Sequence, residues 1–262
     1  MGRLKTPEEI EMMRLAGRVV AEALAAMRDS IIPGVTTTLD LDEVAGHVLE
    51  TRGARSAFVG YRPSFSSVPY LHHTCLSIND EVVHGIPSSK RVLQPGDIIS
   101  LDMGASIDGW YADSAITVPV GEVSSEAKNL LVVTREALYR GIAQARPNNA
   151  MGDIGAAIQR HAERNRYKVI QELVGHGIGN TVHEDPQVPN YGRHGAGLHL
   201  RVGMTICIEP MLNIGSQFVM QDKGDEWTIR TRDRSLSAHF EHTVAITENG
   251  PDILTAPVSE GK

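Results

Sequence analysis

The sequence predicts an α+β fold built from two similar halves, near residues 1–122 and 123–262, each with two helices followed by strands. Two pairs of amphipathic helix patterns, one before residue 54 and one between residues 124 and 166, each precede strand-like segments. Between two such segments, Asp108-Gly109 is a strong hairpin signal. The composition, 41% hydrophobic and 22% charged over 262 residues, is that of a globular protein large enough to bury a core.

Capping and stop signals mark the first helix pair. A Thr-Pro-Glu-Glu run at residues 6–9 forms a capping box with proline in the first turn, and apolar residues then recur at three- and four-residue steps. This pattern predicts a helix to about Arg28. After Pro33-Gly34, a second helix is expected from about Asp40 until Gly53 ends it.

Strands are expected next. Residues 54–73 are predicted to form a long aromatic, serine-rich loop, followed by strands at 74–78, 82–86, 97–107 and 110–118. With a two-residue turn at Asp108-Gly109, Asp113 faces Gly104 across the hairpin. Asp102, two residues from Gly104, then shares one face of the sheet with Asp113.

The second half repeats this order. A serine at 124 or 125 opens a helix to about Gln144, and Gly152 and Asp153 open another to about Arg166. Residues 168–249 return to strands broken by glycine-rich turns. The halves share no convincing sequence identity.

Charge and cysteine usage exclude several classes of protein. A net charge of −7, with no basic run longer than Lys90-Arg91, argues against a nucleic-acid-binding module. No apolar stretch approaches the roughly 18 residues of a membrane span, and no secretory signal is expected, because Glu8 and Glu9 follow Arg3 and Lys5 too soon for its apolar region. Cys75 and Cys207 are therefore expected to be reduced, packed thiols in a cytosolic protein.

Asp102 and Asp113 allow two interpretations. Acidic residues are usually exposed, so the pair could lie on a solvated sheet face. Their apolar neighbours instead indicate a strand buried on both faces, where an unpaired carboxylate is costly. These neighbours are Ile98, Ile99, Leu101 and Met103. In that setting the two carboxylates can converge on ions.

Three more residues have similar surroundings: His176 in a Gly-His-Gly-Ile-Gly run, Glu209 in Ile-Glu-Pro-Met and Glu241 in Phe-Glu-His-Thr. Taken singly, they are consistent with a turn histidine and surface acids. With Asp102 and Asp113 they form a set suited to divalent ions of hard or borderline character. Charge counting favours two ions, because one ion would leave two of four negative charges uncompensated. No HExxH, Gly-x-Ser-x-Gly or phosphate-loop motif occurs.

These five residues and their spacing resemble type I methionine aminopeptidase. The similarity extends over nearly the whole chain, through segments at residues 5–8, 17–18, 77–79, 83–87, 183–191 and 227–238. It implies the pita-bread fold, in which two pseudo-symmetric αα-β halves surround a central antiparallel sheet within a single catalytic domain, 1–262.

The resemblance also implies a metal arrangement. Asp113 and Glu241 would bridge two divalent cations, Asp102 would chelate one, and His176 with Glu209 would complete the other. The cations could be Co²⁺, Mn²⁺, Fe²⁺ or Zn²⁺.

The implied reaction is removal of N-terminal methionine from nascent proteins and peptides when the second residue is small, by metal-activated water. Glu209 would shuttle a proton, and His84 and His183 would contact the substrate. The implied lining of the methionine pocket is Tyr61, Tyr70, Cys75 and Trp227. Ordinary core packing is the alternative for these four. Other expectations are transient ribosome contact, no nucleic-acid specificity, no membrane contact, a monomer and a cytoplasmic location.

The chain departs from the family pattern at Phe58, Val182 and His239, and the loop from Tyr61 to Cys75 is longer than in the shortest relatives. These departures concern the pocket's shape and the surroundings of the metals rather than the reaction. Three rival functions stay open. They are a proline-specific aminopeptidase of the same fold, an inactive peptide-binding module, and a dinuclear phosphatase.

Overall fold

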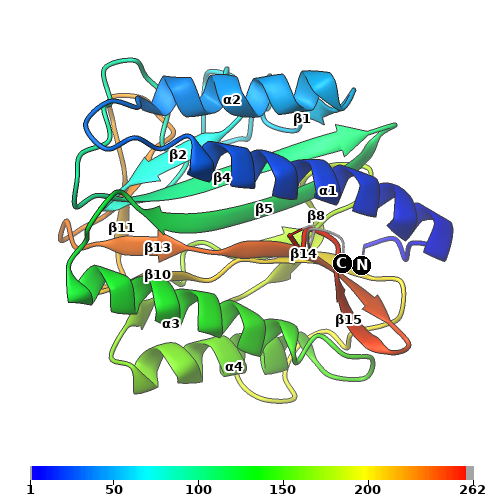
Figure 1. Cartoon of the computed structure of the whole chain (residues 1–262). Helices are drawn as coiled ribbons and strands as arrows, with labels where there is room; N and C mark the ends of the chain where they lie inside the picture. Colours follow the sequence, from blue (N-terminus) through cyan, green and yellow to red (C-terminus); the bar gives the residue numbers. More distant parts are fainter. Residues whose placement is uncertain (1, 258–262) are drawn as a thin grey trace, which may run out of the picture.

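The computed structural model describes residues 2–257, in which four helices pack against a nine-stranded sheet whose strand pairings are all antiparallel (Figure 1). The helices are α1 (Pro7–Asp29), α2 (Thr38–Thr51), α3 (Ser125–Ile142) and α4 (Met151–Arg164). In Figure 1, α1 and α2 lie along β2, β4 and β5, whereas α3 and α4 lie on the side of β10 and β13. The expected order of two helices and then strands therefore occurs twice.

The large sheet runs β1-β4-β5-β14-β9-β7-β8, with β2 also paired to β4 and β15 to β14. Its strands are β1 (Arg55–Ser56), β2 (Cys75–Ile78), β4 (Ile98–Ile107), β5 (Trp110–Pro119), β7 (Gly175–Gly177), β8 (Glu184–Val188), β9 (Thr205–Ile208), β14 (Glu241–Thr247) and β15 (Gly250–Ile253). One three-stranded sheet joins β6 (Lys168–Val169), β10 (Met211–Asn213) and β13 (Ser237–His239). Another joins β3 (Glu81–Val83), β11 (Val219–Gln221) and β12 (Ile229–Thr231).

The helix predictions are confirmed, with shifts at the ends. α1 begins at its predicted capping box, in which the Thr6 hydroxyl accepts from Glu9 N and the Glu9 carboxylate accepts from Thr6 N. α2 begins two residues earlier than expected, because Thr37 is the cap and Asp40 is its partner inside the first turn. α4 ends before the expected Arg166, whose φ of 67° is left-handed.

The hairpin register is confirmed. Asp108 and Gly109 have φ values of 49° and 80°, as a type I′ turn requires, and Gly104 pairs with Asp113. The strand expected at 82–86 is wrong in extent, because β3 ends at Val83 and His84 turns to a φ of 61°.

Each helix pair buries its own apolar cluster against the sheet. One cluster joins α1 and α2 to β4 and β5, and the other joins α3 and α4 to β9, β10 and β14. Asp102 and Asp113, at 8% and 4% exposure, lie among these buried strands, so the solvated-face interpretation is wrong. Among the described residues, no helix is both long and apolar enough to cross a membrane.

Candidate metal centre

The five predicted ligands lie in or directly after five consecutive strands of the large sheet, β4, β5, β14, β9 and β7. Asp102 and Glu241 both pair with Ala115 of β5, from opposite sides, and Asp113 lies two residues from Ala115. These three side chains therefore share one face of the sheet. The pairing of β14 with β9 continues this row to Glu209, directly after β9.

Short distances join the five side chains. Ligand oxygens of Asp102, Asp113 and Glu241 lie within 4.8 Å of one another. His176 Nε2 lies 3.6 Å from Glu209 Oε1 and 4.0 Å from Glu241 Oε1. The structure thus brings together all five.

The five residues line a cavity of about 510 Å³ that also contains every residue predicted to contact the substrate. These are His84, His183, Tyr61, Tyr70, Cys75 and Trp227. A second cavity, of about 660 Å³, is lined by residues of α1, α3 and β5 and by no carboxylate among the described residues. The carboxyl groups therefore single out the first cavity.

The carboxyl groups are buried without a compensating cation, since no described lysine or arginine lines the cavity. Burial raises the pKa of Glu209 to about 8. Burial, with the nearby Glu209, raises the pKa of Asp113 to about 8. The pKa values of Asp102 and Glu241 are raised well above their ordinary range by burial and by neighbouring carboxylates, Asp113 first. Ionising all four groups in this cavity requires a cation that the protein does not itself provide.

His176 is held in its neutral form. Burial, with the neighbouring His183, lowers the pKa of His176 to about 3. Its Nδ1 lies 2.9 Å from the Gly177 carbonyl oxygen, so we assign the proton to Nδ1. The Nε2 lone pair then faces the oxygens of Glu209 and Glu241, an arrangement that a bound cation would stabilise.

Two buried oxygens without a hydrogen-bond partner also support a bound cation. Asp113 Oδ1 and Glu241 Oε1 are buried and have no hydrogen-bond partner. Four carboxylates and one imidazole suit divalent cations, so the residues fit a metal site. Cys207 also lies near His176 and Glu241, but burial raises the pKa of its thiol and Thr243 Oγ1 lies 3.5 Å from its sulfur. Both cysteines are free and buried, as expected for packed thiols.

His239 lies beside the centre, with its Nε2 3.6 Å from Glu209 Oε2. Burial lowers its pKa to about 3, and neither ring nitrogen has a hydrogen-bond partner. From the sequence, His239 was identified only as a departure from the family pattern. It contacts the same carboxylate as His176.

The proposed substrate residues form an aromatic wall next to the carboxylates. Tyr70, Cys75 and Trp227 pack in one apolar cluster with Phe58 and Val182. The ring centroids of Tyr70 and Trp227 are 4.9 Å apart. His183 lies between the two regions, 4.3 Å from the His176 ring and 5.1 Å from the Tyr61 ring.

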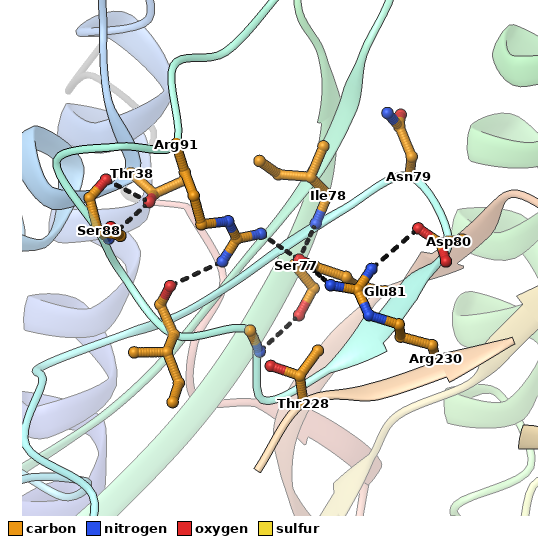
Figure 2. A network of polar contacts seen from close by, with 12 residues as sticks. Thr38, Ser77, Ile78, Asn79, Asp80, Glu81, Ser88, Arg91, Thr228 and Arg230 are labelled. Atoms are coloured by element: carbon orange, nitrogen blue, oxygen red, sulfur yellow. Dashed lines mark hydrogen bonds and ion pairs between the residues drawn. The ribbon is translucent and has the colours of Figure 1, made fainter. Parts of the chain in front are cut away.

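Glu81, Arg91 and Arg230 form a polar network (Figure 2) next to the turn that carries His84. Glu81, buried at 5% exposure, pairs with Arg91 and accepts from Arg230 Nη2 at 2.8 Å. Arg91 Nη1 donates to the Ile86 carbonyl at 2.7 Å, just beyond His84.

The backbone of Gly85, directly after His84, is equally fixed. Gly85 N donates to Ser77 Oγ at 3.1 Å, and the Gly85 carbonyl accepts from Leu76 N at 2.8 Å. A Cβ on Gly85 would lie 2.3 Å from the Leu76 carbonyl oxygen, so only glycine fits. These contacts stabilise the left-handed backbone of His84.

Comparison with known proteins matches residues 11–248 to metallopeptidase family M24. The chain belongs to family M24. It is 49% identical to methionine aminopeptidase of Aquifex aeolicus over 256 residues, which cover 96% of this chain and 98% of the relative.

Solved structures agree with this assignment. A crystal structure of methionine aminopeptidase from Thermotoga maritima matches with a TM-score of 0.93 and 45% identity, covering 97% of this chain and 99% of that one. Prolidase from Pyrococcus furiosus, 24% identical, shares the fold with a TM-score of 0.76, covering 96% of this chain and 65% of that one. The family and the pita-bread fold expected from the sequence are confirmed, and membership of a metallopeptidase family implies bound metal ions.

Sequence reasoning missed Phe65, which lines the cavity from within the loop after Tyr61. The only available signal was an aromatic residue within the loop expected at residues 54–73. That signal does not reveal which way the side chain points.

The raised pKa values predict an unusual pH dependence of stability in the metal-free M24 protein. Between pH 7 and 8, Asp113 and Glu209 hold protons in the folded state, with pKa values of about 8, but not in the unfolded chain. Stability should therefore fall by about 1 kcal/mol between pH 7 and 8 for each such carboxyl, because the proton is mostly bound at pH 7 and about half bound at pH 8. Buried histidines add little slope here, because they are mostly neutral in both states.

Urea unfolding at pH 7 and 8, with and without saturating Mn²⁺, measures this effect. Saturating metal should abolish this slope, because the carboxylates are then ionised in both the folded and the unfolded state. A metal-free protein equally stable at both pH values would contradict the assignment of raised pKa values.

Removing the carboxylate of Glu81 should destabilise the fold. Glu81→Ala leaves Arg91 and Arg230 partly buried without their shared acceptor, which should cost about 3 kcal/mol in the free energy of unfolding. Glu22→Ala is the control, since its pair with Arg52 is exposed and should be worth less than about 1 kcal/mol. Equal losses in the two variants, measured by urea unfolding, would show that the network contributes no more than a surface pair.

Proposed function

We propose that this chain removes the N-terminal methionine from polypeptides by hydrolysis of the first peptide bond. The observation that carries this conclusion is 49% identity to a methionine aminopeptidase along almost the full length of both chains. The protein is thus a methionyl aminopeptidase, and its substrates are protein N-termini. A proline-specific peptidase is disfavoured, because the likeness to prolidase is 24% identity and covers only 65% of that longer chain.

The finer proposal is that the centre holds two divalent cations, of Co²⁺, Mn²⁺, Fe²⁺ or Zn²⁺. Asp113 and Glu241 would contact both, Asp102 one, and His176 with Glu209 the other. Support comes from the unpartnered oxygens of Asp113 and Glu241 and from the charge count of four carboxylates. When bound, the cations lower the pKa of a water molecule and polarise the scissile carbonyl.

The chain's own residues supply proton transfer and substrate binding. We assign proton transfer to the leaving amine to Glu209, whose carboxylate lines the cavity beside His176. Burial lowers the pKa of His84 to about 4 and also lowers that of His183. Both imidazoles are therefore neutral at pH 7, and each can donate one hydrogen bond to the substrate. We assign His84 to the scissile amide and His183 to the oxygen that becomes negatively charged.

The methionine side chain would bind among Tyr61, Tyr70, Cys75 and Trp227. The close packing of this apolar cluster, with sulfur and aromatic edges, suits an unbranched thioether. The carboxylates and both histidines crowd the adjoining bond, so we propose that only a small second residue is accepted.

In the cell, the substrates would be nascent chains, met in the cytoplasm through transient contact with ribosomes. We propose a monomer, without nucleic-acid or membrane binding, in which 1–262 form one catalytic domain with halves near 1–122 and 123–262. Support for a single domain is the large sheet, which takes strands from both halves.

Peptide hydrolysis tests the function. The metal-saturated protein should release methionine from Met-Ala-Ser. It should leave Met-Lys-Ser and Met-Leu-Ser, which have large second residues, almost uncut. Chelated protein should be inactive on all of them, and Mn²⁺ or Co²⁺ should restore activity. Equal cleavage of Met-Ala-Ser and Met-Lys-Ser would refute the size rule, and no cleavage of either would refute the function.

His183→Ala tests the division between ligands and substrate-binding residues. The variant should keep its metal content, measured by mass spectrometry, but lose roughly 10² to 10³ in turnover, the scale for deleting an oxyanion donor. If the variant lost metal together with activity, His183 would be a ligand and our assignment wrong.

A further inference from the structure

Residues 62–69 form a closed loop, here called the 62–69 loop, beside the cavity. Its ends are joined because Gly60 N donates to the Tyr70 carbonyl and Tyr70 N to the Tyr61 carbonyl, both at 2.8 Å. Within it, Ser66 Oγ donates to the Val68 carbonyl at 2.9 Å. Compact surface loops with paired ends keep a defined shape and frequently carry function.

Phe65, in the middle of this loop, lies against two residues of the substrate site. Its ring stacks on His84, with centroids 5.9 Å apart and planes at 11°, and meets Trp227 edge-on at 5.5 Å. Trp227 in turn contacts Tyr70. Phe65 therefore extends the aromatic wall toward the solvent, and it is 49% exposed although it lines the cavity.

A second contact ties the loop to the segment that carries Trp227. The backbone N and the hydroxyl of Ser67 both donate to Glu226 Oε2, at 3.0 and 2.7 Å. These bonds lower the pKa of Glu226, the residue directly before Trp227. The contact fixes Phe65 and Trp227 relative to each other.

We propose that Phe65 is a specificity-determining residue that closes the methionine pocket on its solvent side. The proposal rests on the proposed function and adds a wall to its substrate site. A half-exposed aromatic ring gains burial when a substrate covers it, and a thioether makes favourable contacts with such a ring. Phe65 thereby strengthens binding of methionine and limits the size of the first side chain.

Two consequences separate this role from a purely structural one. Loss of a contact made equally before and during the reaction raises KM and leaves kcat nearly unchanged. Removing the ring also opens space, so a substrate phenyl ring can occupy the place that the enzyme's ring leaves. Selectivity for methionine over phenylalanine at the first position should then decrease.

The test compares Phe65→Ala with Phe218→Ala. Phe218 is a matched control, since it is 51% exposed, does not line the cavity and lies against Arg232. In metal-saturated protein, Phe65→Ala should raise KM for Met-Ala-Ser, and the Kd of L-methionine measured by calorimetry, by roughly five- to tenfold. The ratio of kcat/KM for Met-Ala-Ser over Phe-Ala-Ser should fall about tenfold, and Phe65→Tyr should restore all three values.

Ser67→Ala is a second variant, which keeps the ring but releases the loop, and it should raise KM by a smaller factor. If Phe65→Ala and Ser67→Ala both behave like Phe218→Ala while Met-Ala-Ser is still cleaved, the role of Phe65 is refuted and the proposed function stands. If kcat falls while KM and selectivity hold, Phe65 acts only on His84 and the pocket proposal is likewise refuted. Wild-type protein that fails to cleave Met-Ala-Ser refutes the proposed function itself.

Discussion

Burial of four carboxyl groups without an internal cation is the constraint on which this structure depends. Asp102, Asp113, Glu209 and Glu241 lie in one cavity that no described lysine or arginine lines, and burial raises the pKa of each. A cavity of this kind costs stability unless a cation enters it. The rigid sheet and the two apolar clusters supply the scaffold that can bear this cost.

The groups around the centre are held by packing and hydrogen bonds rather than by chain connectivity. His84 keeps a left-handed backbone because its turn is bonded on both sides, with Glu81 and Arg91 closing the network (Figure 2). Trp227 is fixed from another direction, through the contact of Glu226 with the 62–69 loop. Two surface segments thus meet over the cavity, and each holds one wall of the substrate site.

Local sequence signals made much of the fold and of the candidate metal site predictable. The Asp108-Gly109 turn fixed the register that places Asp102 and Asp113 on one face, and the capping box at Thr6 fixed the start of α1. Five polar residues in apolar or glycine-rich surroundings were enough to indicate the family. The start of α2 was predicted about two residues too late, because the capping pair of Thr37 and Asp40 was overlooked.

Long-range pairing and side-chain direction were not predictable. The insertion of β14 between β5 and β9, which lines up all the ligands, joins segments far apart in sequence and has no local signature. The left-handed backbone of His84 arises from the bonds that Ser77 and Arg91 make with the next two residues, Gly85 and Ile86, not from its own residue type. Phe65 stands in a loop without periodicity, so only the fold shows that its ring reaches the cavity.

Proton release on metal binding is the most direct measure of the central constraint. Calorimetric titration of metal-free protein with Mn²⁺ at pH 7, repeated in buffers of different ionisation enthalpy, counts the protons released per ion. Because the buried carboxyls are protonated before metal enters, we expect at least one proton per bound ion. Tight binding of Mn²⁺ with no proton release would mean that the carboxylates are already ionised in the empty cavity, and would contradict the account.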